Sequence, residues 1–204
     1  MAEIPRRIIL ASASPRRREL LRQAGWRVRV RPAPVNERRL ANETPRQYVL
    51  RLARLKASAA ARVHASRWPI LAADTTVAKM MPGGQFRIYG KPSNAAAAKR
   101  MLRELSGGWH EVWTAIALRA PGSGKIRSRA VKTRVCFADL SGGEIETYIR
   151  AGESFDKAGG YALQGRAAIF IARIAGSPSN VVGLPLAEFY RLWKLFEAEQ
   201  IQNG

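Results

Sequence analysis

Ile8–Leu21, with the sequence IILASASPRRRELL, is the stretch that decides the fold of the first part of the chain. Its apolar beginning predicts a short buried strand. Ser14 followed by Pro15 is typical of a helix N-cap and first helical position, and Gly25 is typical of the residue after a helix. We therefore expect a strand, a serine-containing turn and a helix in succession.

The first turn of this expected helix contains Arg16, Arg17 and Arg18. The positive end of the helix dipole disfavours each cation there by about 0.3–1 kcal/mol. Together with the hydroxyls of Ser12 and Ser14 and the free backbone N–H groups, the arginines fit a bound phosphate. Arginines that extend into solvent on a basic protein are equally compatible with this stretch taken alone.

The composition indicates one folding unit. With 204 residues, 47% of them hydrophobic, the chain can bury one substantial core. Its one cysteine, Cys136, excludes an internal disulfide and fits a reducing compartment. The beginning, MAEIPRR, lacks a signal-peptide pattern, and no apolar stretch approaches the roughly 20 residues of a membrane span. We expect a cytoplasmic protein without a membrane segment.

A net charge of +20 raises the hypothesis of nucleic-acid binding, since lysine and arginine attract phosphates. The arginines, however, are scattered from Arg6 to Arg191. No lysine tail, RNP-like aromatic motif or zinc-finger spacing focuses the charge. Nucleic-acid binding is therefore not expected to be the main function.

A long helix is predicted from Thr44 to about Ala61, because Thr44, Pro45 and Gln47 form a capping-box start. Lys56 lies one position away from the apolar stripe of this helix, where a lysine is usually a surface residue. The stripe itself is predicted to consist of Tyr48, Leu52, Leu55 and Ala59.

The run Pro69–Met81, PILAADTTVAKMM, predicts a buried strand that is interrupted by Asp74. An ionised carboxylate in a core needs a cation, a metal or a changed protonation state beside it. The alternative is a strand-end residue that bonds a neighbouring turn. A turn at 82–84 and the return strand QFRIYGKP predict a hairpin, and symmetric pairing would place Lys91 opposite 74–76.

The remaining chain alternates helices and strands. His110 has no histidine partner at metal-ligand spacing, so we expect it to be structural. The predicted elements are a helix over Ser93–Leu105, a hairpin of Trp109–Leu118 and Ile126–Phe137, a helix from Ser141 to Gly152, a glycine-rich loop over Glu153–Gly165, a strand AAIFIARI and a last helix over Leu186–Glu199.

Together these stretches closely resemble the Maf family of nucleoside triphosphate pyrophosphatases, nearly from end to end. Several long motifs in the right order are far more specific than any one of them. The motifs are SASPRR at 12–17, LARLK at 52–56, ADTTV at 73–77, GKP at 90–92, LSGGWHEVWT at 105–114, DKAGGYALQG at 156–165 and NVVGLP at 180–185.

The resemblance implies an α/β fold with an elongated mixed sheet and flanking helices, like that of the inosine triphosphatase group. It also implies one domain over 1–204, with two lobes around a central cleft that holds the active site. Proteins of the family are commonly homodimers, so a homodimer is expected here as well.

The resemblance further implies roles for individual residues. Asp74 matches the proton acceptor of the family, and Glu37 matches an acid that would help Asp74 hold Mg²⁺ or Mn²⁺. Asn36 replaces a second acid that is usual before it, which leaves open how many carboxylates hold the metal. Whether Asp74 is base, ligand or both also stays open. The family's phosphate-binding residues correspond to Ser12, Arg17, Lys56 and Lys91.

Three positions where Maf subgroups differ concern the substrate. Arg16, Thr75 and Gln164 match the subgroup that hydrolyses dTTP and UTP to the monophosphate and pyrophosphate, whereas the 7-methyl-GTP subgroup tends to have an aromatic, Gln and an acid there. The amide of Gln164 can both donate to and accept from a pyrimidine edge. The alternatives are a 7-methyl-GTP pyrophosphatase and a basic nucleic-acid-binding or division-regulatory protein.

Overall fold

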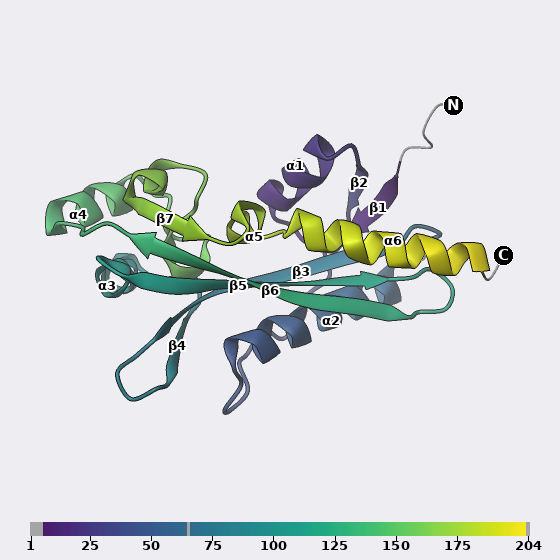
Figure 1. Cartoon of the computed structure of the whole chain (residues 1–204), viewed down its shortest axis with the longest axis horizontal. Helices are drawn as coiled ribbons and strands as arrows, with labels where there is room; N and C mark the ends of the chain where they lie inside the picture. The colour runs from purple at the N-terminus through teal and green to yellow at the C-terminus, as the bar shows by residue number, and fades with distance from the viewer. Residues whose placement is uncertain (1–5, 65, 203–204) are drawn as a thin grey trace. The chain divides into compact units, whose positions relative to one another are not determined.

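The computed structural model describes residues 6–64 and 66–202 (Figure 1). Most of the stretch MAEIPRR, from which we expected no signal peptide, lies outside the described residues. The chain is an α/β protein, as expected. Its elements are β1 (Arg7–Leu10), α1 (Pro15–Gln23), β2 (Arg27–Val30), α2 (Pro45–Val63), β3 (Ile70–Met80), β4 (Phe86–Tyr89), α3 (Ala95–Leu105), β5 (Trp109–Arg119), β6 (Ile126–Phe137), α4 (Gly142–Arg150), the 3-10 helices η1 (Ala158–Gly160) and η2 (Arg166–Phe170), β7 (Ile171–Ala175), α5 (Pro178–Val182) and α6 (Leu186–Gln202).

The seven strands form one mixed sheet in the hydrogen-bonded order β2-β1-β3-β5-β6-β7, and β4 pairs with β3. The chain folds into two compact units. Unit 1 comprises the described residues up to Asp74, Thr114–Val131 and those from Gly183 on, and unit 2 comprises Thr75–Trp113 and Lys132–Val182. The assignment of 1–204 to a single domain stays a prediction. No helix in the described part of the chain is long and apolar enough to cross a membrane.

In unit 1, β1 pairs in parallel with β2 on one side and with β3 on the other. The chain passes from β1 to β2 through α1 and then from β2 to β3 through α2, so the direction of winding reverses between β1 and β3. Right-handed crossovers place α1 and α2 on opposite faces of these strands (Figure 1). Ligands bind beyond the carboxyl ends of strands at such a reversal. The residues that follow β1, and those of β3 just beyond its pairing with β1 up to Asp74, are therefore where a site is expected in unit 1.

Local signals begin both helices of unit 1. Ser14 caps α1, and Thr44 forms the expected capping box with Gln47 at the start of α2. The predicted apolar stripe of α2 is wrong at Leu55, which is 42% exposed. The buried face contains small residues instead, because a helix can approach a sheet closely over alanine; its members are Val49, Leu52, Ala53, Ala57 and Ala60.

The last helix, α6, packs its predicted apolar face inward. Its Phe189 and Trp193 lie against Trp26, with ring centroids 4.8 Å and 4.3 Å away. Leu192 and Phe196 are buried as well. The expectation for this helix is confirmed, and its aromatic residues form part of the core of unit 1.

In unit 2, β3 and β4 form the predicted hairpin with the predicted symmetric register, from Met80 paired with Phe86 to Val77 paired with Tyr89. The ladder ends there, so Lys91 lies beyond the paired residues. Helix α3 begins after Asn94, whose side chain accepts from a backbone N–H, rather than at Ser93. The hydrophobic core of unit 2 is formed by Val77, Tyr89, Leu102, Leu105, Val112, Val135, Phe137, Ile145, Tyr148, Tyr161, Ala167 and Phe170.

In unit 2 one expected strand is partly wrong, and one short helix was not predicted. The predicted strand AAIFIARI is a strand only from Ile171, because Arg166–Phe170 forms a 3-10 helix in which Ala168 N donates to Gly165 O. The segment SPSNVV, for which no element was predicted, contains the short helix α5. Ser177 Oγ accepts from Asn180 N at 3.3 Å, which is an N-cap contact that the Ser-Pro pair could have indicated.

Candidate active site

The turn after β1 is organised by its two serines. Ser12 Oγ accepts from Ser14 N at 3.3 Å and from Arg17 Nη1 at 2.8 Å, and Ser14 Oγ accepts from Arg17 N at 3.4 Å. Because the Ser12 oxygen accepts two hydrogen bonds, its own proton remains available to an acceptor such as a phosphate oxygen. No acidic residue lies in the first turn of α1. The turn keeps the features expected of an anion site.

Arg17 is held by backbone carbonyls as well as by Ser12. Its Nε donates to Gly183 O at 2.8 Å, and its Nη1 donates to Ala73 O at 2.9 Å. Burial lowers the pKa of Arg17, while the carboxylate of Asp74 opposes this effect. The hypothesis that the arginines all extend into solvent is therefore wrong for Arg17, although Arg18 is exposed. Arg17 ties the β1–α1 turn to the residue before Asp74.

Asp74, Lys56 and Glu37 form the central charged cluster of unit 1. The Nζ atom of Lys56, from α2, is 2.7 Å from Asp74 Oδ1 and 2.7 Å from Glu37 Oε1. Asp74 is only 6% exposed, and the structure supplies the cation that such a carboxylate needs. The cation is Lys56, a residue that the sequence alone left as weak evidence. It comes from α2 and not from the strand that pairs with β3.

The electrostatics of this cluster favour a proton acceptor. Burial raises the pKa of Asp74, and the charges of Lys56 and Arg17 and the hydrogen bond from Lys56 oppose that rise. A carboxylate with a raised pKa holds a proton more readily than one in water, which is what a general base requires. Buried carboxylates with a raised pKa beside a specific cation are typical of active sites.

A metal ion would find two carboxylates here. Among residues 6–64 and 66–202, no three His, Cys, Asp or Glu side chains are grouped to hold a metal. Asp74 and Glu37, however, share the same lysine nitrogen and offer oxygen ligands. Mg²⁺ is commonly bound by one or two carboxylates, with substrate phosphates and water as the other ligands. The residues present therefore fit a divalent ion that is completed by a phosphate-bearing substrate.

Two further residues act on the segment that carries Glu37, and the sequence did not single them out. Tyr48 Oη donates to Glu37 O at 3.0 Å, and Arg51 Nη2 donates to Arg38 O at 3.1 Å. Tyr48 was predicted as part of the apolar stripe of α2. A tyrosine in such a stripe usually needs a partner for its hydroxyl, which is the signal that could have identified it.

Thr75, Lys91 and Gln164 belong to unit 2. Thr75 directly follows Asp74 in β3 and is partly buried, whereas Lys91 and Gln164 are exposed. Within unit 2 the structure brings two of the sequence motifs together, because Gly159 N donates to Gly90 O at 3.1 Å. The roles of these three residues stay predictions.

A side chain at Gly159 would be strained. Gly159 has a φ of +71°, and a Cβ added there would lie 3.0 Å from a methyl carbon of Val77. At this glycine the DKAGGYALQG segment therefore packs closely against Val77 of β3.

His110 is buried in unit 2, with its Nε2 2.6 Å from Tyr161 Oη. Burial lowers its pKa from 6.5 to about 3. A neutral histidine inside a core agrees with the structural role that we expected.

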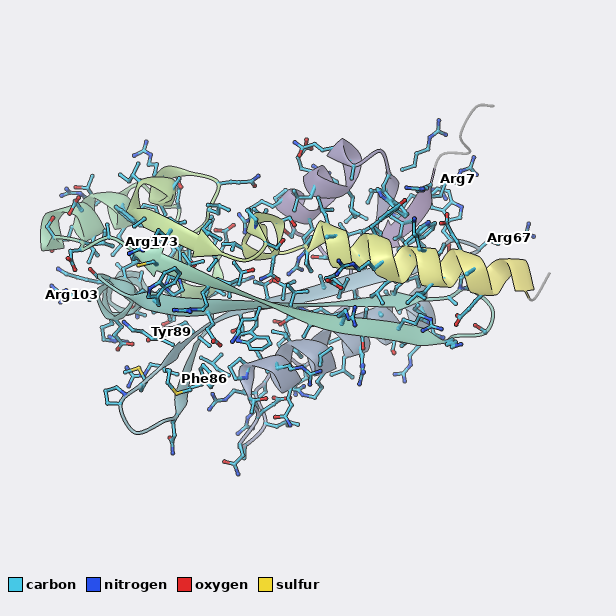
Figure 2. All side chains as sticks on the ribbon, in the orientation of Figure 1. Arg7, Arg67, Phe86, Tyr89, Arg103 and Arg173 are labelled. Carbon is cyan, nitrogen blue, oxygen red and sulfur yellow. The ribbon has the colours of Figure 1, made fainter. Side chains whose placement is uncertain are left out.

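The positive charge is spread over both units. Arg7 and Arg67 in unit 1 and Arg103 and Arg173 in unit 2 are all exposed (Figure 2). These exposed arginines are scattered over the structure as they are over the sequence.

Comparisons with known proteins bear on this site. The sequence profile described as "Maf-like protein" matches residues 7–196. A protein of Anaeromyxobacter dehalogenans named dTTP/UTP pyrophosphatase is 50% identical over 184 residues, 89% of this chain and 90% of that protein. One of the same name from Myxococcus xanthus is 48% identical over 181 residues, 89% of this chain and 88% of that protein.

Among solved structures, that of the Staphylococcus aureus Ham1 protein is 17% identical, covers 65% of this chain and 72% of that chain, and has a TM-score of 0.45. The family profile covers the turn of Ser12 and Arg17, the cluster of Asp74, Lys56 and Glu37, and both units of the fold. On this evidence the chain belongs to the Maf family.

Proposed function

We propose that the protein is a nucleoside triphosphate pyrophosphatase that hydrolyses dTTP and UTP to the monophosphate and pyrophosphate. The observation that carries the proposal is the buried Asp74, which Lys56 pairs at 2.7 Å beside the turn that follows β1. The names of relatives at about half identity support the same activity and substrates. A role in the nucleotide pool of the cytoplasm follows from this activity.

The phosphates of the substrate bind at the start of α1. The backbone N–H groups of the first turn and the hydroxyl proton of Ser12 donate to phosphate oxygens. Lys56 and Lys91 supply positive charge, and Arg16 adds to it from the same turn as Ser14. This charge stabilises the negative charge that builds up on the leaving pyrophosphate.

The reaction is the attack of a water oxygen on the α-phosphorus. A new bond forms between that oxygen and the α-phosphorus, and the bond from the α-phosphorus to the oxygen that bridges to the β-phosphate breaks. The carboxylate of Asp74 accepts the proton of the water, for which its raised pKa suits it. Pyrophosphate leaves with the bridging oxygen, and the nucleoside monophosphate keeps the oxygen that came from water.

Asp74 and Glu37 would hold a divalent cation, Mg²⁺ or Mn²⁺. Bound there, the cation supplies charge neutralisation on the phosphate oxygens and lowers the pKa of nearby water. The residues of the chain do the rest: Lys56 places a positive charge beside both carboxylates, and Arg17 fixes the backbone carbonyl before Asp74.

The experiment that tests the proposal is a panel of standard and modified nucleoside triphosphates, with pyrophosphate release measured in Mg²⁺ and in Mn²⁺. We expect dTTP and UTP to be hydrolysed well ahead of CTP and 7-methyl-GTP. A clear preference for 7-methyl-GTP would overturn the substrate. Absence of release from every nucleotide, together with RNA binding of steep salt dependence, would favour a binding protein instead. The homodimer stays a prediction that sedimentation of the same preparation tests.

A further inference from the structure

The loop between β2 and α2 carries Glu37 and is fastened to α2 through its backbone. Tyr48 and Arg51 hold the carbonyl oxygens of two successive residues, Glu37 and Arg38, at 3.0 Å and 3.1 Å. Positions three residues apart on a helix lie on the same face. The two side chains therefore act on one short stretch of the loop from one side of the helix.

Arg51 is itself fixed. Its Nε is 2.6 Å from Glu43 Oε1 and its Nη2 is 2.8 Å from Glu43 Oε2, and the same Oε2 accepts from Leu40 N at 3.1 Å. The hydrogen bond from Arg51 lowers the pKa of Glu43, so this carboxylate stays charged near neutral pH. The guanidinium also lies 5.7 Å from the centroid of the Tyr48 ring. The guanidinium of Arg51 thus links the side chain of Glu43, near the end of the loop, to the backbone carbonyl of Arg38.

Tyr48 is suited to donate rather than to ionise. A tyrosine phenol has an ordinary pKa of about 10, so it keeps its proton at physiological pH. Its hydroxyl remains a donor to Glu37 O.

The position of the Glu37 carboxylate depends on these hydrogen bonds to the loop backbone. Its side chain is 56% exposed and its residue lies in a loop without regular structure. An ion pair with so exposed a partner contributes little, because water screens the charges and both long side chains lose freedom. The contact with Lys56 is therefore a weak constraint on where the carboxylate lies, whereas hydrogen bonds to the carbonyls fix the backbone from which the side chain extends.

We propose that Tyr48 and Arg51 are positioning residues that hold the Glu37 loop so that its carboxylate lies beside Asp74. This inference rests on the proposed function, in which the two carboxylates share a divalent cation. Neither side chain touches the reacting atoms. Their effect is to keep Glu37 in place before the metal and the nucleotide bind.

Two substitutions test the inference. Tyr48→Phe removes one hydroxyl and keeps the ring, and Arg51→Lys keeps the charge but loses the two-pronged hold on Glu43. Tyr190→Phe, on the exposed tyrosine of α6, is the matched control. The first measurement is hydrogen exchange of the amides of 38–43 in the protein without metal or nucleotide. We expect exchange about fivefold faster in both variants, as for the loss of one ordinary hydrogen bond, and unchanged in the control.

The second measurement is pyrophosphate release from dTTP as a function of Mn²⁺ concentration. We expect the half-saturating Mn²⁺ concentration to rise about three- to tenfold, while kcat at saturating Mn²⁺ stays within about twofold of the unsubstituted protein. Unchanged loop exchange in both variants would overturn the inference. Faster exchange with an unchanged Mn²⁺ dependence would also overturn it, because the contacts would then serve the loop alone. If the unsubstituted protein released no pyrophosphate, the proposed function would fail, and the exchange measurement would still decide whether the two side chains hold the loop.

Discussion

Lys56 and Asp74 form an ion pair between α2 and β3 in which Nζ and Oδ1 are 2.7 Å apart. Burial nevertheless raises the pKa of Asp74, which means that the lysine does not fully offset the cost of keeping this carboxylate away from water. A group kept at such a cost is typical of a site retained for chemistry rather than for stability.

Asp74→Asn should abolish catalysis without unfolding the protein. We expect pyrophosphate release to fall by about 10²–10⁴-fold, the usual contribution of a general base. The amide removes a carboxylate whose burial is only partly offset by its partners, so the melting temperature should change by only a few degrees. Pyrophosphate release and a thermal melt of the same preparation check both parts. Near-native turnover would remove Asp74 from the mechanism.

Lys56→Met should destabilise the protein as well as inactivate it. The substitution leaves Asp74 buried without its cation, a change that typically costs about 3–5 kcal/mol. The double variant Lys56→Met with Asp74→Asn should recover most of this loss, because no buried charge remains. Urea unfolding at pH 7 measures all three variants.

A matched control for this substitution is Lys125→Met, whose side chain is 60% exposed and pairs with Glu199. It should change the free energy of unfolding by less than about 1 kcal/mol. If Lys56→Met changed the free energy of unfolding equally in the unsubstituted protein and in Asp74→Asn, the two residues would have no energetic coupling.

The pH dependence of stability should report His110. Above pH 6.5 this histidine is neutral in both the folded and the unfolded chain; between 6.5 and about 3 the unfolded chain binds a proton that the buried ring rejects. The free energy of unfolding should therefore fall as pH drops through that window. Between pH 7 and pH 4.5, the free energy of unfolding should fall by roughly 2 kcal/mol less in His110→Gln than in the unsubstituted protein.

His64→Gln, the control, removes the other of the two histidines, at the C-cap of α2. It should leave the pH dependence close to that of the unsubstituted protein. Urea midpoints at the two pH values give the comparison, and an unchanged slope in His110→Gln would contradict the assignment.

Much of the fold could be predicted because its signals are local. Ser14 with Pro15 and Thr44 with Gln47 act within one helical turn, so each helix start was readable without tertiary information. The apolar run before β7 was misread, since composition does not separate a short strand from a 3-10 helix. Helix α5 was missed because it has only five residues and little periodicity.

The sequence could predict which kinds of group the site contains, but not which residue pairs with which. A carboxylate in an apolar strand demands a partner, which the sequence indicated for Asp74. The identity of that partner depends on how α2 lies on β3, and no pattern within either element reports it. Arg17 is less predictable still, because two of its acceptors are the carbonyl oxygens of Ala73 and Gly183, and every residue has a carbonyl.

Gln164→Glu tests the assignment of the substrate. The residue lies between η1 and η2 with its side chain exposed, so the substitution should change the free energy of unfolding by no more than about 0.5 kcal/mol. The amide can donate to O4 and accept from the N3–H of thymine or uracil, whereas a carboxylate only accepts and favours a positively charged ring such as 7-methylguanine. We therefore expect the preference for dTTP and UTP over CTP and 7-methyl-GTP to shrink about tenfold, which is the effect of losing one well-placed hydrogen bond to a base and facing its acceptor with a charge.

Ratios of kcat/KM for the four nucleotides measure this preference. Gln85→Glu, in the exposed turn before β4, controls for the added negative charge within unit 2. Because a distant charge lowers the affinity for every triphosphate alike, the control should leave the ratios unchanged even if all rates fall. Equal ratios in Gln164→Glu and Gln85→Glu would show that Gln164 does not read the base, and the selectivity for pyrimidines would then have to come from another residue of the chain.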